Sequence, residues 1–152
     1  MKLKIFIIFF MLILLLTSFF VINYLKNKNS VVEFYQVAFD KCFSMPHYDE
    51  IEYFLIDYDN LIDFNKKTKI TEEQKEKLKE YFSKNLKVKE YTNEYDIEKS
   101  AIITVTLNIE NSKEININIT EMFNGLKKMY VYNLYRKNYI WNISELSNIF
   151  IS

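Results

Sequence analysis

The apolar residues divide the chain into one uninterrupted apolar run and a longer patterned region. Residues 5–22, IFIIFFMLILLLTSFFVI, contain no charged residue, glycine or proline. A helix of this run is roughly 27 Å long at about 1.5 Å per residue, close to the hydrocarbon thickness of a bilayer. We therefore expect residues 1–29 to form a transmembrane signal-anchor that contacts the membrane through residues 5–25, and residues 30–152 to form one domain.

Cleavage of the apolar segment is the alternative to an uncleaved anchor. A signal peptide has a shorter apolar region followed by an A-x-A-like site, which residues 16–18 match poorly. Two lysines precede the run and two follow it, so the positive-inside rule scarcely discriminates between the two orientations of the helix. A short N-terminal tail nevertheless favours a domain outside the cytoplasm. The sequence predicts a single-pass cell membrane protein with an external C-terminal domain. A secreted domain released near Ser18 is the alternative.

Helical periodicity in the domain predicts three helices. Ser30-Val31-Val32-Glu33 has the pattern of a capping box, and the helix after it is expected to end at Ser44-Met45-Pro46. A second helix is expected from Tyr48 to Phe64. A third begins at the capping box Thr71–Gln74 and runs to about Asn85. The residues expected to face the core are Val31, Phe34, Tyr35, Ala38 and Cys42, then Ile51, Phe54, Leu55, Tyr58, Leu61 and Ile62, then Leu78, Tyr81 and Phe82.

After Leu86 the apolar pattern changes to a period of two, which indicates strands. Strands are expected at Val88–Tyr95, Ala101–Ile109, Ile115–Thr120, Lys128–Tyr135 and Tyr139–Ser144, with turns at 110–113, at Asn124-Gly125 and at Arg136–Asn138. Helices followed by an antiparallel meander give an α+β fold. We expect about three helices packed on a curved antiparallel sheet of four to five strands.

Residues 130–146, YVYNLYRKNYIWNISEL, hold the only tryptophan and the only arginine of the chain. Alternation divides this aromatic stretch into two strands, one with Tyr130, Tyr132 and Leu134 on a shared face. The other strand carries Tyr139, Trp141 and Ile143 on one face. We therefore interpret the stretch as a hairpin of the sheet and expect Trp141 to be largely buried.

The order of elements and the last hairpin, Tyr132 to Ile143 with its basic turn and Trp-x-Ile strand, resemble the NTF2-like (cystatin-like α+β roll) domains of small bacterial membrane-anchored or lipoprotein-like proteins of unknown function. The resemblance covers about residues 31–148. It implies a cone in which the sheet curls around the helices, with a pocket between them in some members. This chain lacks the lipobox cysteine of the lipoprotein members and the Asp–His or Tyr–Asp pair of the enzymatic members, so no family site can be carried over.

Charge and composition narrow the function classes. Four of the 20 basic residues lie in the first 29 residues, which contain no acid, so the remainder has 16 basic and 20 acidic residues and a net charge of −4. A mildly acidic domain argues against a nucleic-acid partner. The single cysteine excludes an internal disulfide and any multi-cysteine metal site. The bias toward Ile, Asn, Lys, Phe and Tyr suits a low-GC bacterium.

Few residues suggest chemistry. His47, the only histidine, follows Pro46 in a predicted turn, and we interpret it as exposed and without a role, although a general base is the alternative. The segment 57–63, DYDNLID, faintly resembles a calcium loop but lacks its glycine and terminal glutamate, so an amphipathic helix with an acidic face is preferred. Cys42 is expected to be a core residue.

The aromatic content leaves a ligand pocket open as an alternative, with Tyr35, Asp40 and Trp141 as candidate lining residues and Glu33 as a second candidate acid. No cofactor or metal is implied. We expect a membrane-anchored binding or assembly module without catalysis, with a protein partner or a second copy contacting the sheet. A small-ligand or enzymatic pocket using His47, Asp40 or a tyrosine is the alternative.

Overall fold

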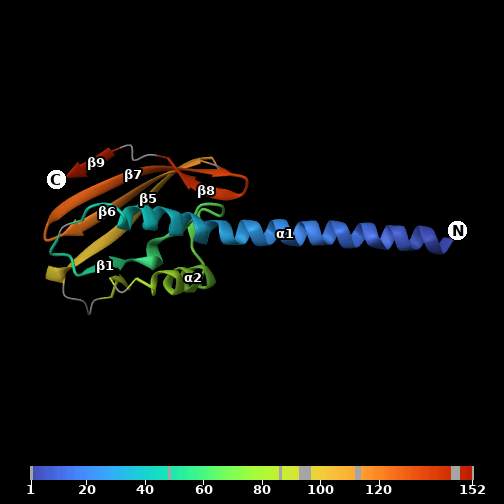
Figure 1. Ribbon diagram of the computed structural model, residues 1–152, viewed down its shortest axis with the longest axis horizontal. Helices are drawn as coiled ribbons and strands as arrows, with labels where there is room; N and C mark the ends of the chain where they lie inside the picture. The colour runs from blue at the N-terminus through green and yellow to red at the C-terminus, as the bar shows by residue number, and fades with distance from the viewer. Residues whose placement is uncertain are drawn as a thin grey trace.

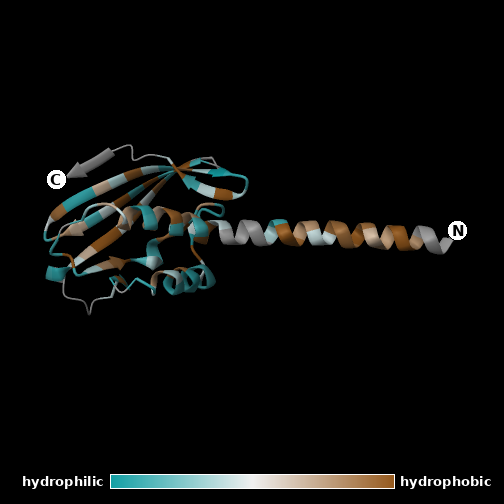
Figure 2. Cartoon of the chain, in the orientation of Figure 1, coloured by the Kyte–Doolittle hydropathy of each residue, from teal (hydrophilic) through white to brown (hydrophobic). Residues whose placement is uncertain are grey.

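The computed structural model describes residues 2–47, 49–85, 87–92, 97–111, 114–144 and 148–151. The fold is α+β, as predicted, and a long N-terminal helix, α1 (Lys2–Phe43), enters a curled sheet with its C-terminal part (Figure 1). The sheet has the strand order β4-β1-β5-β6-β7-β8, and β9 also pairs with β7. The apolar first half of α1 projects from the domain (Figure 2).

The sheet is mixed, because β5 to β8 are antiparallel neighbours whereas β1 runs parallel to both β4 and β5. It has seven strands, so the predicted antiparallel sheet of four to five strands is wrong in both respects. The elements after α1 are β1 (Tyr53–Ile56), the 3-10 helix η1 (Tyr58–Asn60), β2 (Ile62–Asp63), β3 (Thr68–Lys69), α2 (Glu72–Phe82), β4 (Val88–Glu90), the 3-10 helix η2 (Ile97–Lys99), β5 (Ser100–Asn111), β6 (Glu114–Phe123), β7 (Leu126–Lys137), β8 (Ile140–Ile143) and β9 (Asn148–Ile151).

Helix α1 does not begin at Ser30, so the predicted capping box there is wrong. The helix runs unbroken from the apolar segment into the domain, and its amides at this point find carbonyls one turn earlier. Ser30 is buried instead and accepts a hydrogen bond from the Asn65 side chain at 3.3 Å. The predicted end at residues 44–46 is confirmed, since α1 stops at Phe43. The predicted apolar stripe from Val31 to Cys42 is fully buried.

The second predicted helix, Tyr48–Phe64, is wrong, because this segment contains β1, η1 and β2. Phe54, Leu55 and Ile56 of β1 are buried between the parallel neighbours β4 and β5. A short apolar run satisfies a helical and a buried-strand pattern equally well, and here tertiary pairing decides. The side chains expected to be buried are nevertheless buried or half-buried.

Helix α2 begins as the sequence predicts. The Thr71 hydroxyl accepts from the Gln74 amide at 3.3 Å, and the Gln74 side-chain oxygen accepts from the Thr71 amide at 2.8 Å, which completes a capping box. The Gln74 side chain also donates to the buried Asp63 carboxylate at 3.1 Å. Leu78 and Phe82 are buried and Tyr81 is half-buried, as expected for the inner edge of this helix.

Replacing Thr71 with alanine should lower the free energy of unfolding by about 1 kcal/mol, because the Gln74 backbone amide at the start of α2 loses its side-chain acceptor. Thr71→Ser keeps the hydroxyl and is the matched control, expected to stay close to the wild type. Urea unfolding of the full-length protein in detergent micelles, followed by circular dichroism, measures both. Equal losses in the two variants would contradict the capping role.

The strand predictions hold along β5, β6 and β7. Ile115, Ile117 and Ile119 are buried on one face of β6, and the β6–β7 hairpin turns at Asn124-Gly125, where φ is +49° and +77°. The basic turn is shifted from its predicted place, since Lys137 pairs with Ile140 and the turn residues are 138–139. Strand β4 covers only Val88–Glu90 of the predicted Val88–Tyr95, and residues 93–96 and 112–113 lie outside the described residues.

The core lies between the inner face of the sheet and the C-terminal part of α1. Phe34 makes edge-to-face contacts with Tyr35, Phe64 and Trp141, with ring centroids 5.1, 4.9 and 5.1 Å apart. Trp141 is 2% exposed, which confirms the prediction that it is buried. The aromatic stretch at residues 130–144 therefore contributes to the core through alternate side chains.

Candidate functional site

The three residues predicted to line a pocket do not converge on one point. Tyr35 is fully buried, and its hydroxyl donates to the Ile62 carbonyl and accepts from the Ile62 amide, each at 2.9 Å. Burial raises the pKa of Tyr35, so its phenol stays protonated. Trp141 is buried in the core with its ring edge-to-face against Phe34. Asp40 is exposed and accepts a hydrogen bond from the Tyr81 hydroxyl of α2 at 2.6 Å.

His47 is paired, so its interpretation as an exposed turn residue without a role is wrong. Its Nδ1 contacts Oε2 of Glu121, and the side chains are only 12% and 0% exposed. The imidazole also lies 4.6 Å from the Phe54 ring and 6.1 Å from the Tyr130 ring, centroid to centroid. The turn after Pro46 folds inward because the sheet supplies a carboxylate to this ring.

Tyr130 completes the polar group, which we call the His47–Glu121–Tyr130 cluster. The Tyr130 hydroxyl lies 3.3 Å from Glu121 Oε2 and 3.3 Å from the Pro46 carbonyl, which also accepts from Lys128 Nζ at 3.0 Å. Burial, and then the charge of Glu121, raise the pKa of Tyr130. The cluster therefore joins the segment that follows α1 to strands β6 and β7.

Two polar atoms of the cluster are left over. His47 Nε2 and Glu121 Oε1 are buried and have no hydrogen-bond partner within the described part of the chain. A histidine held by a carboxylate at one nitrogen can act as a general base at the other. Here Nε2 is enclosed, so a substrate would have to displace the surrounding packing to reach it. The arrangement thus fits a stabilising contact between the segment after α1 and the sheet better than an acid–base site.

The alternation along β6 carries a signal for Glu121, which is not among the candidate site residues proposed from the sequence. Residues 115, 117, 119 and 123 of β6 are all buried, and Glu121 occupies the remaining position of the same alternating row. A charged residue at an inward position is almost never fully buried without a partner. That rule predicts a partner for Glu121 but does not say that it is His47, which lies 74 residues earlier in the chain.

Cys42 lies beside the same cluster and is fully buried, as predicted for a core residue. Burial first, and then the nearby Glu121 carboxylate, raise the pKa of its thiol above the ordinary value of 9.0, although Lys128 opposes this. The thiol therefore stays protonated in the folded protein, and the thiolate is the nucleophile. We therefore expect Cys42 to be an unreactive packing residue.

Iodoacetamide should alkylate Cys42 far more slowly in the folded protein than in urea, because the folded thiol is buried and protonated. Mass spectrometry of the intact chain measures this rate. Since the folded pKa is raised, the thiol favours the folded state fully below pH 9.0, and this contribution is lost as the pH rises above that value. Rapid alkylation in the folded protein at neutral pH would contradict the assignment.

The acidic segment 57–63 forms the 3-10 helix η1 and the short strand β2, so the amphipathic α-helix preferred from its sequence is wrong. Asp63 is 2% exposed and accepts from the amides of Asn65 and Lys66 at 3.0 and 3.3 Å, as well as from Gln74. Asp59 pairs with Lys75 of α2 at 2.5 Å. The carboxylates of this acidic segment thus hold the β2–β3 turn and α2. The described residues contain no group of three or more His, Cys, Asp or Glu side chains that could hold a metal ion.

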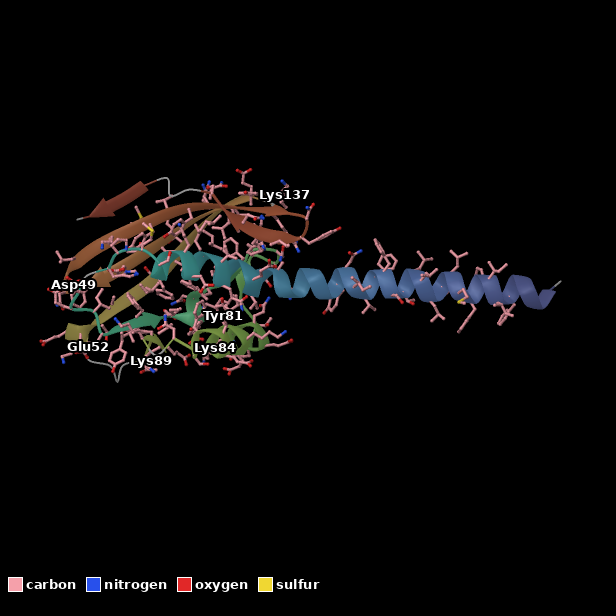
Figure 3. The ribbon with its side chains drawn as sticks, in the orientation of Figure 1. Asp49, Glu52, Tyr81, Lys84, Lys89 and Lys137 are labelled. Atoms are coloured by element: carbon pink, nitrogen blue, oxygen red, sulfur yellow. The ribbon has the colours of Figure 1, made fainter. Side chains whose placement is uncertain are left out.

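An open groove lies between α1 and α2. It is lined by Val32, Glu33, Gln36, Lys77, Glu80, Tyr81 and Lys84. Figure 3 labels Tyr81 and Lys84 at the α2 side. Its charged residues carry both signs in equal number, so the groove shows no preference for an anion or a cation. Glu33, named from sequence as a possible pocket acid, accepts from the Trp141 amide at 3.2 Å.

Comparison of the chain with protein-family models, with curated proteins and with solved structures finds no match.

Proposed function

We propose that this protein is a single-pass membrane protein that holds a non-catalytic binding or assembly domain outside the cytoplasm, close to the bilayer. The observation that carries the proposal is the continuity of α1. Its residues Phe6–Tyr24 are long and apolar enough to cross a membrane and are not buried against the domain, while the stretch from residue 30 onward is a core helix.

An unbroken helix fixes the domain relative to the anchor. Only five residues separate Tyr24 from Ser30, which is the first buried residue among those whose burial the structure describes. The two lie about 9 Å apart along the helix. A flexible linker would let the domain reach for distant partners, whereas this connection holds it at the bilayer surface in one orientation. Such a domain suits the assembly of partners that are themselves at the membrane.

The contact surface we propose is the outer face of the sheet. Thr104, Thr106 and Asn108 of β5 are exposed there, alternating with the inward-facing residues. The helices against the inner face of a curled sheet also support the proposed NTF2-like cone, in which the outer face is available to a protein partner or to a second copy. Nucleic acid is not proposed as a partner, given the acidic balance of residues 30–152.

Membrane fractionation of the full-length protein tests the anchor. We expect the chain to stay in the membrane fraction after an alkaline carbonate wash, at its uncleaved mass. Alkaline phosphatase fused after Ser152 should be active and a green fluorescent protein fusion dark. Leu14→Arg together with Leu15→Arg is the control, because each arginine costs about 2.5–3.5 kcal/mol at a span centre. A shortened, soluble chain would instead support the secreted alternative.

The pocket alternative has one observation in its favour, the buried carboxylate of Glu121. It also requires space in which a ligand could reach this carboxylate. His47 and Tyr130 occupy the contacts of Oε2, and Oε1 is enclosed. The geometry therefore supports the binding module better than the enzyme.

A further inference from the structure

The β7–β8 hairpin extends toward the projecting part of α1. Figure 1 shows its turn beside α1 at the end of the domain from which the apolar helix leaves. Lys137 lies at this end, whereas Asp49 and Glu52 lie at the opposite end (Figure 3). If α1 crosses a membrane, this hairpin is on the side of the domain that faces the bilayer.

The turn of this hairpin has an unusual residue. Tyr139 adopts φ of +66°, and its side chain is 58% exposed. A bulky residue at positive φ is a conformational outlier, and two-residue hairpin turns favour Asn-Gly. The β6–β7 hairpin at the other end of the same strand uses Asn124-Gly125. Folding alone therefore does not explain a tyrosine at the membrane-side turn.

Ile140 next to it is also 58% exposed, so the tip presents two adjacent apolar side chains to solvent. The Arg136 guanidinium lies 5.7 Å from the centre of the Tyr139 ring, and Lys137 is exposed. Aromatic residues with a polar end prefer the membrane interface, and long basic side chains extend toward lipid phosphates. The hairpin tip has the composition of an interfacial contact.

Distances along the chain place the tip of the β7–β8 hairpin at about the depth of the lipid headgroup layer. Glu33, which accepts from the Trp141 amide, is nine residues beyond Tyr24, or about 13 Å along the helix. Tyr139 lies two residues nearer the span than Trp141, about 7 Å along a strand. For a strand that runs parallel to α1, and for α1 along the bilayer normal, the tip is about 7 Å beyond the end of the apolar segment. This is comparable to the roughly 5–7 Å of headgroup layer on each side of a bilayer.

We propose that Tyr139 and Ile140 at the β7–β8 tip insert into the interfacial layer of the bilayer that α1 spans, as a second membrane contact of the domain. The proposal rests on the proposed function, because it requires α1 to be in the membrane. Among the described residues, two carboxylates lie near the tip: Glu33, which is bonded to the Trp141 amide, and Glu114, which is bonded to Asn133 at 3.1 Å. The two apolar side chains therefore carry the contact, and the basic residues support it.

Fluorescence quenching in reconstituted vesicles tests this contact. The variants are Tyr139→Trp at the tip and Leu126→Trp at the distal hairpin, where Leu126 is 45% exposed. The wild type, with only the buried Trp141, gives the baseline. In phosphatidylcholine vesicles containing brominated lipid, most of the emission added by Tyr139→Trp should be lost. The emission added by Leu126→Trp should be unaffected.

The outcomes separate the two proposals. If the full-length proteins float with the vesicles and Tyr139→Trp is quenched no more than Leu126→Trp, the hairpin contact is refuted and the anchor stands. If the proteins do not float with vesicles at all, the anchor is refuted and the hairpin contact with it.

A second variant separates membrane contact from a folding role of the ring. Tyr139→Gly suits positive φ and should raise Tm in detergent micelles. A fall in Tm would show that the ring is needed for folding, which contradicts the proposal.

Discussion

Replacing His47 with leucine should lower the free energy of unfolding by about 3–5 kcal/mol, the usual cost of removing one partner from a buried pair. Glu121 would remain fully buried, and among the described residues the Tyr130 hydroxyl, 3.3 Å away, would be its one remaining hydrogen-bond donor. Leucine fills similar space, so lost packing contributes little of this effect. Urea unfolding of the full-length protein in detergent micelles, followed by circular dichroism, measures the change.

The double variant His47→Leu with Glu121→Leu is the matched control. It removes both members of the pair and continues the apolar row formed by Ile115, Ile117 and Ile119 on β6. Replacing both partners with apolar residues is often neutral or stabilising, so most of the lost stability should return. A double variant as unstable as His47→Leu would show that the pair is not the reason for the loss.

Replacing Phe34 with alanine should also cost about 3–5 kcal/mol, because it leaves a cavity at the centre of the core. Phe34 is fully buried and contacts three aromatic rings, those of Tyr35, Phe64 and Trp141. Edge-to-face contacts of this kind contribute about 0.5–1.5 kcal/mol each beyond the area that they bury. Thermal and urea unfolding of the variant measure the total.

Trp141 reports the same change locally. Its emission should shift to longer wavelength in Phe34→Ala, as water reaches the cavity beside the indole. Phe34→Leu is the graded control, with an expected cost smaller than that of Phe34→Ala because leucine keeps most of the apolar side-chain volume but not the ring contacts. Equal stability of Phe34→Ala and the wild type would show that α1 is not packed against β8 in the way described.

Several elements could be predicted from the chain because their signals are local. The capping box at Thr71 needs only residues within one helical turn, and the turn at Asn124-Gly125 needs only two residues of suitable conformation. Alternation of apolar residues predicted the inner faces of β5, β6 and β7. The helix expected between Tyr48 and Phe64 was wrong because its apolar spacing also fits a short buried strand, and the pairing partners lie far away in the chain.

The candidate site shows the same division. The buried face of β6 places Glu121 in the core, and that could be read from its alternation with three isoleucines. The identity of its partner depends on the turn after Pro46 reaching the sheet, and no local pattern encodes this contact. The sequence suggested Asp40 for a pocket, but its partner Tyr81 lies on α2 and holds it at the surface.

The sequence by itself determined that the chain carries an apolar segment long enough to span a bilayer, an α+β domain and a buried Trp141, because length, composition and periodicity are local properties. Only the tertiary structure decided that α1 continues without a break into the core, that β1 lies parallel between β4 and β5, and that His47 is paired inside the domain. Each of these features depends on contacts between segments that are distant in the sequence. The burial of apolar surface stabilises such contacts only when the whole domain has folded.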